Sequence, residues 1–256
     1  MPKAYHLNID KKDIKGSVTA LLPGDPARCR LIASEITKRY GGSARLLAEK
    51  REFTSYLVCG GKKTVLVTST GIGGPSASIA IEELARLGIK NFLRVGTTGS
   101  IQKNIKAGDA VITTASVRLD GASLHYAPIE YPAVADFSIV NALIMGAKAA
   151  KIKFHAGISA SSDTFYQGEE RHDRFRKYII RAIKGSTTEW KALHVLNFEM
   201  ESATILTVAA SMGLKAGCVT GVVNKGGEGN ITPEKLRLGE SAAVKTAIAA
   251  LAYMEE

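Results

Sequence analysis

The chain has 256 residues, of which 45% are hydrophobic and 23% charged, and its net charge is +10. This composition excludes a disordered chain, because enough apolar surface is present to form a sizeable core. We predict a single domain over residues 1–256, since no linker divides the sequence. The N-terminal stretch lacks the apolar core of a signal peptide, and no apolar run approaches the ~20 residues that span a bilayer. We therefore expect a cytoplasmic protein that contacts no membrane.

Charge and cysteine content bear on what the chain binds. The basic excess is typical of a solvated surface, a nucleic-acid interface or a small-anion site. Basic residues are scattered and not interleaved with aromatic residues, which disfavours nucleic acid, whereas a few well-placed arginines suffice for a small anion. Cys29, Cys59 and Cys218 are odd in number and widely spaced. They predict free thiols in a reducing compartment and neither a disulfide framework nor a zinc site.

Short apolar, β-branched runs alternate with helical patterns along the chain. In chain order the predicted elements are a strand at 18–22, a helix at 27–38, a strand at 64–70, a helix at 76–87, strands at 91–96 and 110–117, a helix at 138–150, a strand at 155–160, a helix at 201–212, a strand at 218–223 and a helix at 233–253. This alternation predicts an α/β fold with helices on both faces of a mainly parallel sheet. Ligands of such sheets collect at the carboxyl ends of the strands.

Two glycine-containing loops follow predicted strands. The first joins the strand at 18–22 to its helix and contains Gly24, Pro26 and Arg28. A helix N-terminus with an arginine suits an anion, although turn chemistry alone also explains the glycine and proline. The second loop, at 69–76, opens a helix as a phosphate loop does, but it matches neither GxGxxG nor a Walker motif. A tight structural turn is the simpler interpretation there.

The apolar strand at 91–96 contains Arg94. Burying a guanidinium without a partner is costly, and no acidic residue adjacent in sequence supplies one. Arg94 is therefore interpreted either as an anion ligand or as a surface residue. Thr97 follows just past the strand end, where its hydroxyl is available to a ligand.

Three later segments carry polar groups. In 161–171 an aromatic residue, Phe165, precedes donors and acceptors, which suits a flat ligand such as a base or, equally, a surface loop with a core phenylalanine. Acidic residues at 199–201 precede an apolar helix, where they either complement its dipole or hold ribose hydroxyls. The glycine-rich segment 225–230 is expected to be a loop, either a connector or a lid.

Taken together, these stretches resemble a known family. The segments STGIGGPSASIAIEELARLGIKNFLRVGTTGSI, VITTASVRLDGASLHYAPIEYPAVADF, ASSDTFYQGEER and NFEMESATIL occur in that order. From Tyr5 to the last helix the chain resembles the uridine phosphorylase branch of the nucleoside phosphorylase family. The resemblance implies a three-layer α/β/α fold with a central mixed, mostly parallel β-sheet. It also implies a pentosyltransferase that splits uridine reversibly into uracil and ribose 1-phosphate, with inorganic phosphate as co-substrate and no cofactor.

Matching positions imply site residues and an assembly. Phosphate binding is implied for Gly24, Arg28, Arg94 and Thr97, and for Arg51 reaching across from the partner subunit. Ribose binding is implied for Thr97, Met200 and Glu201, and for His6 from the partner subunit. Base binding is implied for Phe165, Glu169 and Arg171, and a structural potassium ion at the dimer interface for Glu52, Ile72 and Ser76. Arg28, Arg94 and Glu201 are the implied catalytic residues. The implied assembly is a homo-oligomer, commonly a hexamer of dimers, with shared active sites.

The chain departs from the family pattern at the base. Glu169 replaces the glutamine that reads the base, and Lys225 follows Asn224 where uracil-specific members have an arginine. An ionised carboxylate only accepts hydrogen bonds. Three solutions are open: Glu169 is protonated through burial, it is neutralised by Arg171 or Lys225, or the pocket takes a 6-oxopurine.

Asn224 disfavours the purine alternative, since purine-specific relatives tend to carry an aspartic acid at that position. We therefore expect uridine phosphorolysis, with a 6-oxopurine nucleoside phosphorylase as the alternative. A nucleosidase that uses water is a further alternative, which Arg28 and Arg94 disfavour because a hydrolase has no use for a phosphate site.

Overall fold

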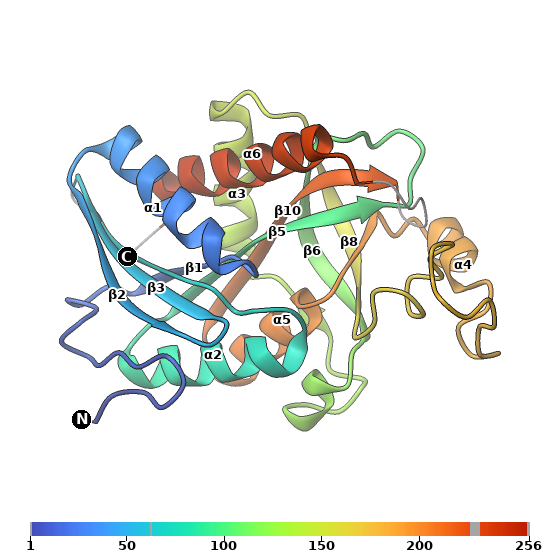
Figure 1. Ribbon diagram of the computed structural model, residues 1–256, viewed down its shortest axis with the longest axis horizontal. Helices are drawn as coiled ribbons and strands as arrows, with labels where there is room; N and C mark the ends of the chain where they lie inside the picture. Colours follow the sequence, from blue (N-terminus) through green and yellow to red (C-terminus); the bar gives the residue numbers. More distant parts are fainter. Residues whose placement is uncertain (1, 62, 226–230, 255–256) are drawn as a thin grey trace.

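The computed structural model describes residues 2–61, 63–225 and 231–254 (Figure 1). The strands are β1 (Thr19–Leu22), β2 (Ser43–Lys50), β3 (Phe53–Gly60), β4 (Lys63–Thr68), β5 (Asn91–Ser100), β6 (Ala110–Leu119), β7 (Ala133–Val134), β8 (Phe154–Ser162), β9 (Asn197–Glu199) and β10 (Lys215–Lys225). The helices are α1 (Pro26–Tyr40), α2 (Gly74–Leu87), α3 (Phe137–Ala149), α4 (Ser186–Ala192), α5 (Ser202–Ser211) and α6 (Pro233–Ala250). Every predicted strand and helix is present. The predicted helix at 233–253 ends as α6 at Ala250 and continues as a 3-10 turn.

The strands form one mixed sheet. At its centre β4, β1, β5 and β10 are parallel neighbours, and β6 pairs antiparallel with β10 but parallel with β8. The hairpin of β2 and β3 extends the sheet antiparallel to β4. On the other side β9 links β8 to β5, so β5, β10, β6, β8 and β9 close on themselves in a ring. The mixed sheet predicted from the family resemblance is confirmed.

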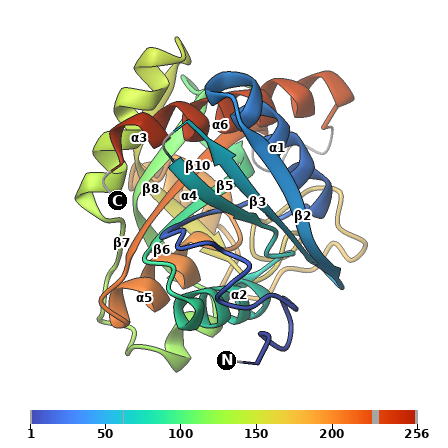
Figure 2. The same ribbon diagram turned by 90° about the vertical axis from the view of Figure 1, so that its left-hand side faces the viewer.

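Helices cover both faces of the sheet, as expected. Helices α1, α3 and α6 lie on one face, and α2 and α5 lie on the other, in both views (Figures 1 and 2). The strand β5 runs through the core, where Phe92, Leu93 and Val95 are fully buried. Helix α5 is buried from Ser202 to Ala209, because it lies between the sheet and α2. In the described part of the chain no helix is long and apolar enough to cross a membrane.

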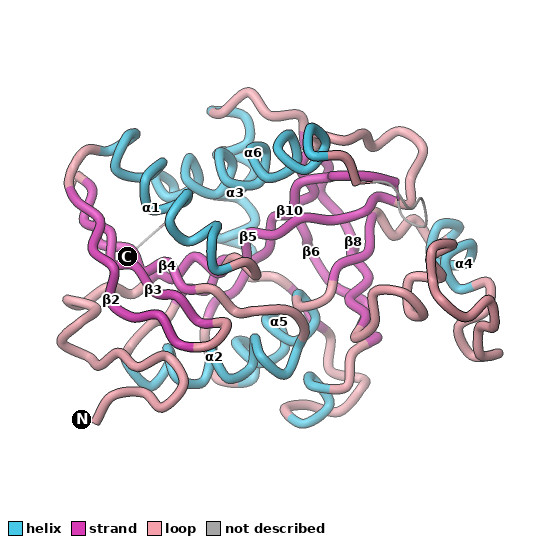
Figure 3. The backbone as a smooth tube through the Cα atoms, in the orientation of Figure 1, coloured by secondary structure: helices cyan, strands magenta, loops and turns pink. Residues whose placement is uncertain are grey.

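The parallel centre of the sheet gathers several loops at one edge. The carboxyl ends of β1, β4 and β5 meet there, followed by the loops that lead to α1 and α2. Helix α5 also begins there, directly after β9. Residues 163–185, between β8 and α4, consist of loops and turns at one end of the molecule (Figure 3). Three helix N-termini and one irregular segment therefore converge at the edge where a ligand is expected.

Candidate active site

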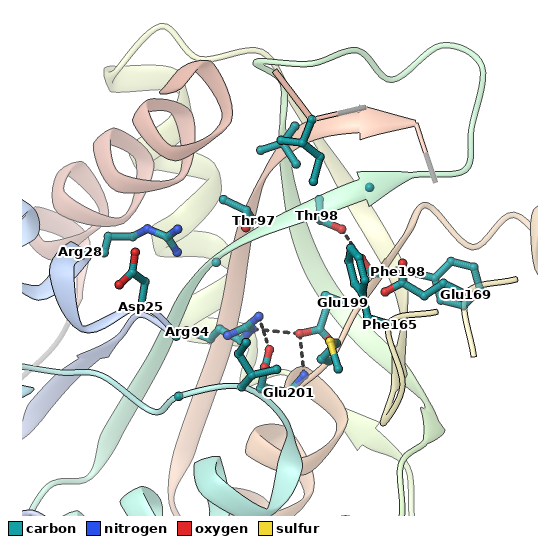
Figure 4. Close-up of a pocket in the computed structure, with 18 of the residues that line it drawn as sticks. Asp25, Arg28, Arg94, Thr97, Thr98, Phe165, Glu169, Phe198, Glu199 and Glu201 are labelled. Atoms are coloured by element: carbon teal, nitrogen blue, oxygen red, sulfur yellow. Dashed lines mark hydrogen bonds and ion pairs between the residues drawn. The ribbon is translucent and has the colours of Figure 1, made fainter. Parts of the chain in front are cut away.

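A cavity of about 720 Å³ lies at the carboxyl edge of the sheet. Figure 4 shows Arg28 at one side, Phe165 and Glu169 at the other, and Arg94 with Glu201 between them. The predicted site residues that line it are Gly24, Arg28, Glu52, Ile72, Ser76, Arg94, Thr97, Phe165, Glu169, Arg171, Met200 and Glu201. The fold therefore brings into one cavity the residues predicted for phosphate, ribose, base and cation on a single chain.

Arg94 forms the centre of a buried charge cluster. Its Nε donates to Glu199 at 2.9 Å, and its Nη2 forms an ion pair with Glu201. All three side chains are nearly or fully buried. Adjacent sequence offers no acid to Arg94, but the fold supplies two from the junction of β9 and α5. Arg94 is therefore no surface residue, and its Nη1 has no hydrogen-bond partner among the described residues.

Glu199 is a site residue for which no role was predicted. Its carboxylate accepts from the backbone N–H of Glu201 at 3.0 Å and of Ser202 at 2.9 Å. It thus satisfies free N–H groups at the start of α5 and places negative charge at the positive end of the helix dipole. The same carboxylate holds Arg94. The only sequence signal was its place in the acidic segment before a predicted helix, which does not distinguish it from Glu201.

Glu201 is held from two sides. Its Oε1 accepts the backbone N–H of Gly73 at 2.6 Å, and Arg94 contacts its Oε2. Gly73 has φ +92°, a conformation that side-chain-bearing residues rarely adopt, and a Cβ at Gly74 would lie 2.3 Å from Oγ1 of Thr204. These glycines let the loop before α2 dock on α5. Burial raises the pKa of the Glu201 carboxyl, whereas Arg94 lowers it.

Arg28 occupies the end of the cavity formed by the first turn of α1. Asp25 caps that helix by accepting from Ala27 at 2.9 Å, which fixes the turn that presents Arg28. The Arg28 side chain is buried, and its Nη2 and Nε donate to Glu240 of α6 at 2.6 and 3.2 Å. Glu240 is a second residue that sequence reasoning missed, because nothing near it marks a site.

The opposite end of the cavity has the chemistry of a base pocket. The Arg171 guanidinium lies 4.1 Å from the centroid of the Phe165 ring. Arg171 is buried and donates two hydrogen bonds to Asp173, at 2.9 and 3.0 Å. This bidentate pair fixes the guanidinium plane against the aromatic ring. A flat ligand edge can meet both groups there.

Glu169 is 5% exposed and lines the same end of the cavity. Burial raises the pKa of its carboxyl to about 8; Arg171 opposes this, while Glu199 and Glu201 add to it. The Arg171 fork is engaged by Asp173, and no ion pair of Glu169 is found among the described residues. Of the three solutions for Glu169, protonation through burial has direct support in the geometry. Of the segment 225–230, predicted to be a loop that serves as a connector or a lid, Lys225 is the last residue of β10, and 226–230 lie outside the described residues.

Glu52 and Ser76 lie side by side, as predicted for a cation site. The Ser76 hydroxyl donates to Oε1 of Glu52 at 3.1 Å. Ile72 is 77% exposed in the loop between β4 and α2. A carboxylate, a hydroxyl and a backbone carbonyl are oxygen donors of the kind that hard cations prefer. The residues present fit such an ion.

His6 and Arg51, which were predicted to act across a dimer, do not line the cavity of their own chain. The His6 Nδ1 lies 2.8 Å from Oε1 of Glu83 on α2. Arg51 is exposed in the turn between β2 and β3, with φ +55°. Their action in a partner subunit stays a prediction.

Comparison with known proteins supports the family resemblance independently of the geometry of the cavity. Residues 19–255 match the family described as the phosphorylase superfamily. The chain is 52% identical over 247 residues to the uridine phosphorylase of Salmonella typhimurium and 51% identical to that of Escherichia coli, covering 96% of each chain in both cases. It is 33% identical over 219 residues to the guanosine phosphorylase of Halorubrum lacusprofundi, covering 86% of this chain and 82% of that one.

Proposed function

The chain belongs to the phosphorylase superfamily, and we propose that it is a uridine phosphorylase, which uses inorganic phosphate to convert uridine reversibly into uracil and ribose 1-phosphate. The observation that carries this proposal is the single cavity that joins Arg28 and Arg94 to a ribose carboxylate, Glu201, and to the pocket of Phe165 and Arg171. The relatives that cover 96% of the chain at 51–52% identity carry the name uridine phosphorylase, which supports the same substrate.

Phosphate binds at the arginine end of the cavity. Arg94 is anchored by two carboxylates, yet its Nη1 donor is unused by the described residues. A fork of guanidinium donors suits phosphate oxygens. Phosphate held there acts as the nucleophile at the ribose and stabilises the positive charge that develops on the sugar. The rate gain comes from positioning and electrostatics, since the cavity needs no covalent intermediate.

Glu201 fixes the ribose between phosphate and base. Its carboxylate is ordered by Gly73 and Arg94, and each carboxylate oxygen retains lone pairs for the ribose hydroxyls. Because Arg94 contacts Glu201 as well as the phosphate end, the two substrates meet around one guanidinium. This coupling places the nucleophile and the sugar in fixed relative positions before reaction.

Glu169 and Arg171 recognise the base. A protonated Glu169 carries one O–H donor and one carbonyl acceptor, the same pair that the side-chain amide of a glutamine offers to uracil. Its burial favours this neutral form at neutral pH, and no ion pair of Glu169 is found within the described part of the chain. Arg171 donates to a carbonyl of the base as negative charge grows on the leaving uracil.

A 6-oxopurine nucleoside is the second candidate substrate. An ionised Glu169 would accept the N1–H of such a base, and one similar protein is named a guanosine phosphorylase. Asn224, which lines the cavity, is not the acid that would protonate a leaving purine. Uridine remains the better substrate on these grounds.

We further propose a cytoplasmic homo-oligomer, a hexamer of dimers, in which His6 and Arg51 of one subunit complete the site of its partner. No organic cofactor takes part. Glu52, Ser76 and the carbonyl of Ile72 would hold a potassium ion with a structural role.

The test is release of free base from uridine, thymidine, inosine and guanosine, each with and without inorganic phosphate. We expect uracil from uridine only when phosphate is present. Purine release under the same conditions would move the proposal to the second candidate. Cleavage without phosphate would show a nucleosidase and remove the role given to Arg28 and Arg94.

A further inference from the structure

Glu240 contacts a phosphate-binding arginine from outside the substrate cavity. Arg28 and Glu240 lie 212 residues apart in sequence, yet Oε1 of Glu240 accepts from both Nη2 and Nε of Arg28, at 2.6 and 3.2 Å. Glu240 does not line the substrate cavity. It lines a separate cavity of about 730 Å³ between α1, the end of α3 and α6.

The geometry of this pair decides how Arg28 faces the substrate. A guanidinium has five N–H donors in one plane. Glu240 accepts from Nε and from one N–H of Nη2, which fixes the plane of the Arg28 guanidinium. Nη1 and the second N–H of Nη2 then remain as donors for a ligand. The contact of Nη1 with the carbonyl of Val95 is long, at 3.5 Å. Among the described residues, Glu240 is therefore the close ionic partner that orients Arg28.

We propose that Glu240 is a positioning residue for phosphate, which acts through Arg28 by holding its guanidinium ready to bind the anion. This inference rests on the proposed function, because it assumes that Arg28 binds phosphate. An arginine side chain loses considerable rotamer freedom when it binds a ligand, and a partner that orders it beforehand removes part of that loss.

Glu240 could also act in the opposite direction, by weakening phosphate binding, and experiment can distinguish the two effects. The negative charge of Glu240 weakens the local attraction for phosphate. If charge alone mattered, removing it would tighten phosphate binding. If positioning dominates, removing it weakens phosphate binding, and the effect is larger when both hydrogen bonds are lost than when one can remain.

Two variants test this difference. Glu240→Gln keeps an oxygen that can accept one hydrogen bond from Arg28, whereas Glu240→Ala keeps none. We expect the KM for phosphate to rise about tenfold or more in Glu240→Ala, the loss typical of a charge-assisted hydrogen bond, and less in Glu240→Gln. The KM for uridine at saturating phosphate should stay within about twofold of the wild-type value.

The matched control is Glu35→Gln, which removes a carboxylate from the same outer cavity. Glu35 pairs with the exposed Lys38 and not with Arg28. This variant should leave the KM for phosphate unchanged. Thermal unfolding of all variants shows that the change is not a loss of folded protein.

A double-mutant cycle gives the decisive readout. In an Arg28→Lys background, Glu240→Gln should add less than about twofold to the phosphate KM, because a residue that acts through Arg28 has no further effect once the guanidinium is gone. An equal effect in both backgrounds, or an unchanged or lower phosphate KM in Glu240→Ala and Glu240→Gln, overturns the proposal.

Direct titration of inorganic phosphate by calorimetry separates this inference from the proposed function. Wild-type protein that binds phosphate but does not cleave uridine would refute uridine as the substrate, and a weaker phosphate affinity in Glu240→Ala would still support the positioning role. Wild-type protein that binds no phosphate would refute the positioning role as well.

Discussion

Replacing Glu169 by glutamine should remove a pH dependence from uridine binding. The wild-type carboxyl is buried, and burial raises its pKa to about 8, with Glu199 and Glu201 adding to the rise and Arg171 opposing it. Only the neutral acid can donate to a carbonyl of uracil. The amide of a glutamine donates at every pH, so Glu169→Gln keeps the shape and the donor but loses the titration.

The size of the effect follows from that pKa. With a value of about 8, roughly nine-tenths of Glu169 is neutral at pH 7 and roughly one-tenth at pH 9. If only the neutral form binds uridine, the apparent KM rises in proportion to the loss of the competent fraction. The ratio of the wild-type KM for uridine to that of Glu169→Gln should therefore rise about tenfold between pH 7 and pH 9.

The assay is the initial rate of uracil release at saturating phosphate from pH 6 to pH 9.5. Ionisation of uridine and of phosphate affects both proteins equally, so it cancels in the ratio. Glu170→Gln serves as control, because Glu170 accepts hydrogen bonds from Gly185 and Thr187 outside the cavity. A ratio that stays flat from pH 6 to pH 9.5 would refute the neutral acid and leave an ionised Glu169 as the alternative.

Ionisation of the Glu169 carboxyl also makes the folding stability of the protein depend on pH. The folded state holds the Glu169 proton up to about pH 8, whereas the unfolded chain releases it near its usual value of 4.5. Between these limits the folded state binds more protons, so wild-type stability falls as pH rises, by up to about 1.4 kcal/mol per pH unit. The advantage of Glu169→Gln in urea unfolding should thus widen from pH 5 to pH 8 and then stop widening.

Three other changes have outcomes that the structure predicts. Arg94→Met should lower the free energy of unfolding by about 3–5 kcal/mol, measured in urea, because Glu199 and Glu201 stay buried without their cation; a loss below 1 kcal/mol would mean that the carboxylates relax into solvent. Gly74→Ala should cost about 1–3 kcal/mol in the same assay, since its Cβ would meet Thr204 at 2.3 Å. Arg51→Met should be inactive alone but regain activity when refolded together with inactive Arg28→Met, because mixed dimers contain one intact site; no recovery would contradict a shared site.

Most of the fold was predictable because its central strands are short, apolar and β-branched, and helices separate them. Sequence reasoning missed four strands. One of them, β3, is mostly buried and carries an apolar signal that was overlooked, whereas the other three lack this signal. Strand β2 is largely exposed at the edge of the sheet, and β7 and β9 are too short to show a period. Helix α4 has no buried residue, so no apolar face marks it.

The sequence predicted which residues line the cavity but not the ion pairs that join them. The residues that match the family pattern line one cavity, except for His6 and Arg51, which were predicted to act from a partner subunit. The partners of the arginines were not predictable, because Glu199 lies 105 residues from Arg94 and Glu240 lies 212 residues from Arg28. Such contacts depend on the register of strands and helices that no local pattern specifies.

These pairings also bear on how phosphate is bound. The positive charges of Arg28 and Arg94 face the negative charges of Glu199, Glu201 and Glu240. The charge of Arg171 is balanced by that of Asp173. With Glu169 neutral, these groups leave the phosphate end with more negative than positive charge. A phosphate dianion entering such a site needs a further cation. In the proposed dimer Arg51 of a neighbouring subunit would supply that charge, since Arg51 is exposed on the hairpin turn and does not line the cavity of its own chain. The electrostatics of one chain thus favour a shared site independently of the family resemblance, since the two arginines inside the cavity are already neutralised by their own chain.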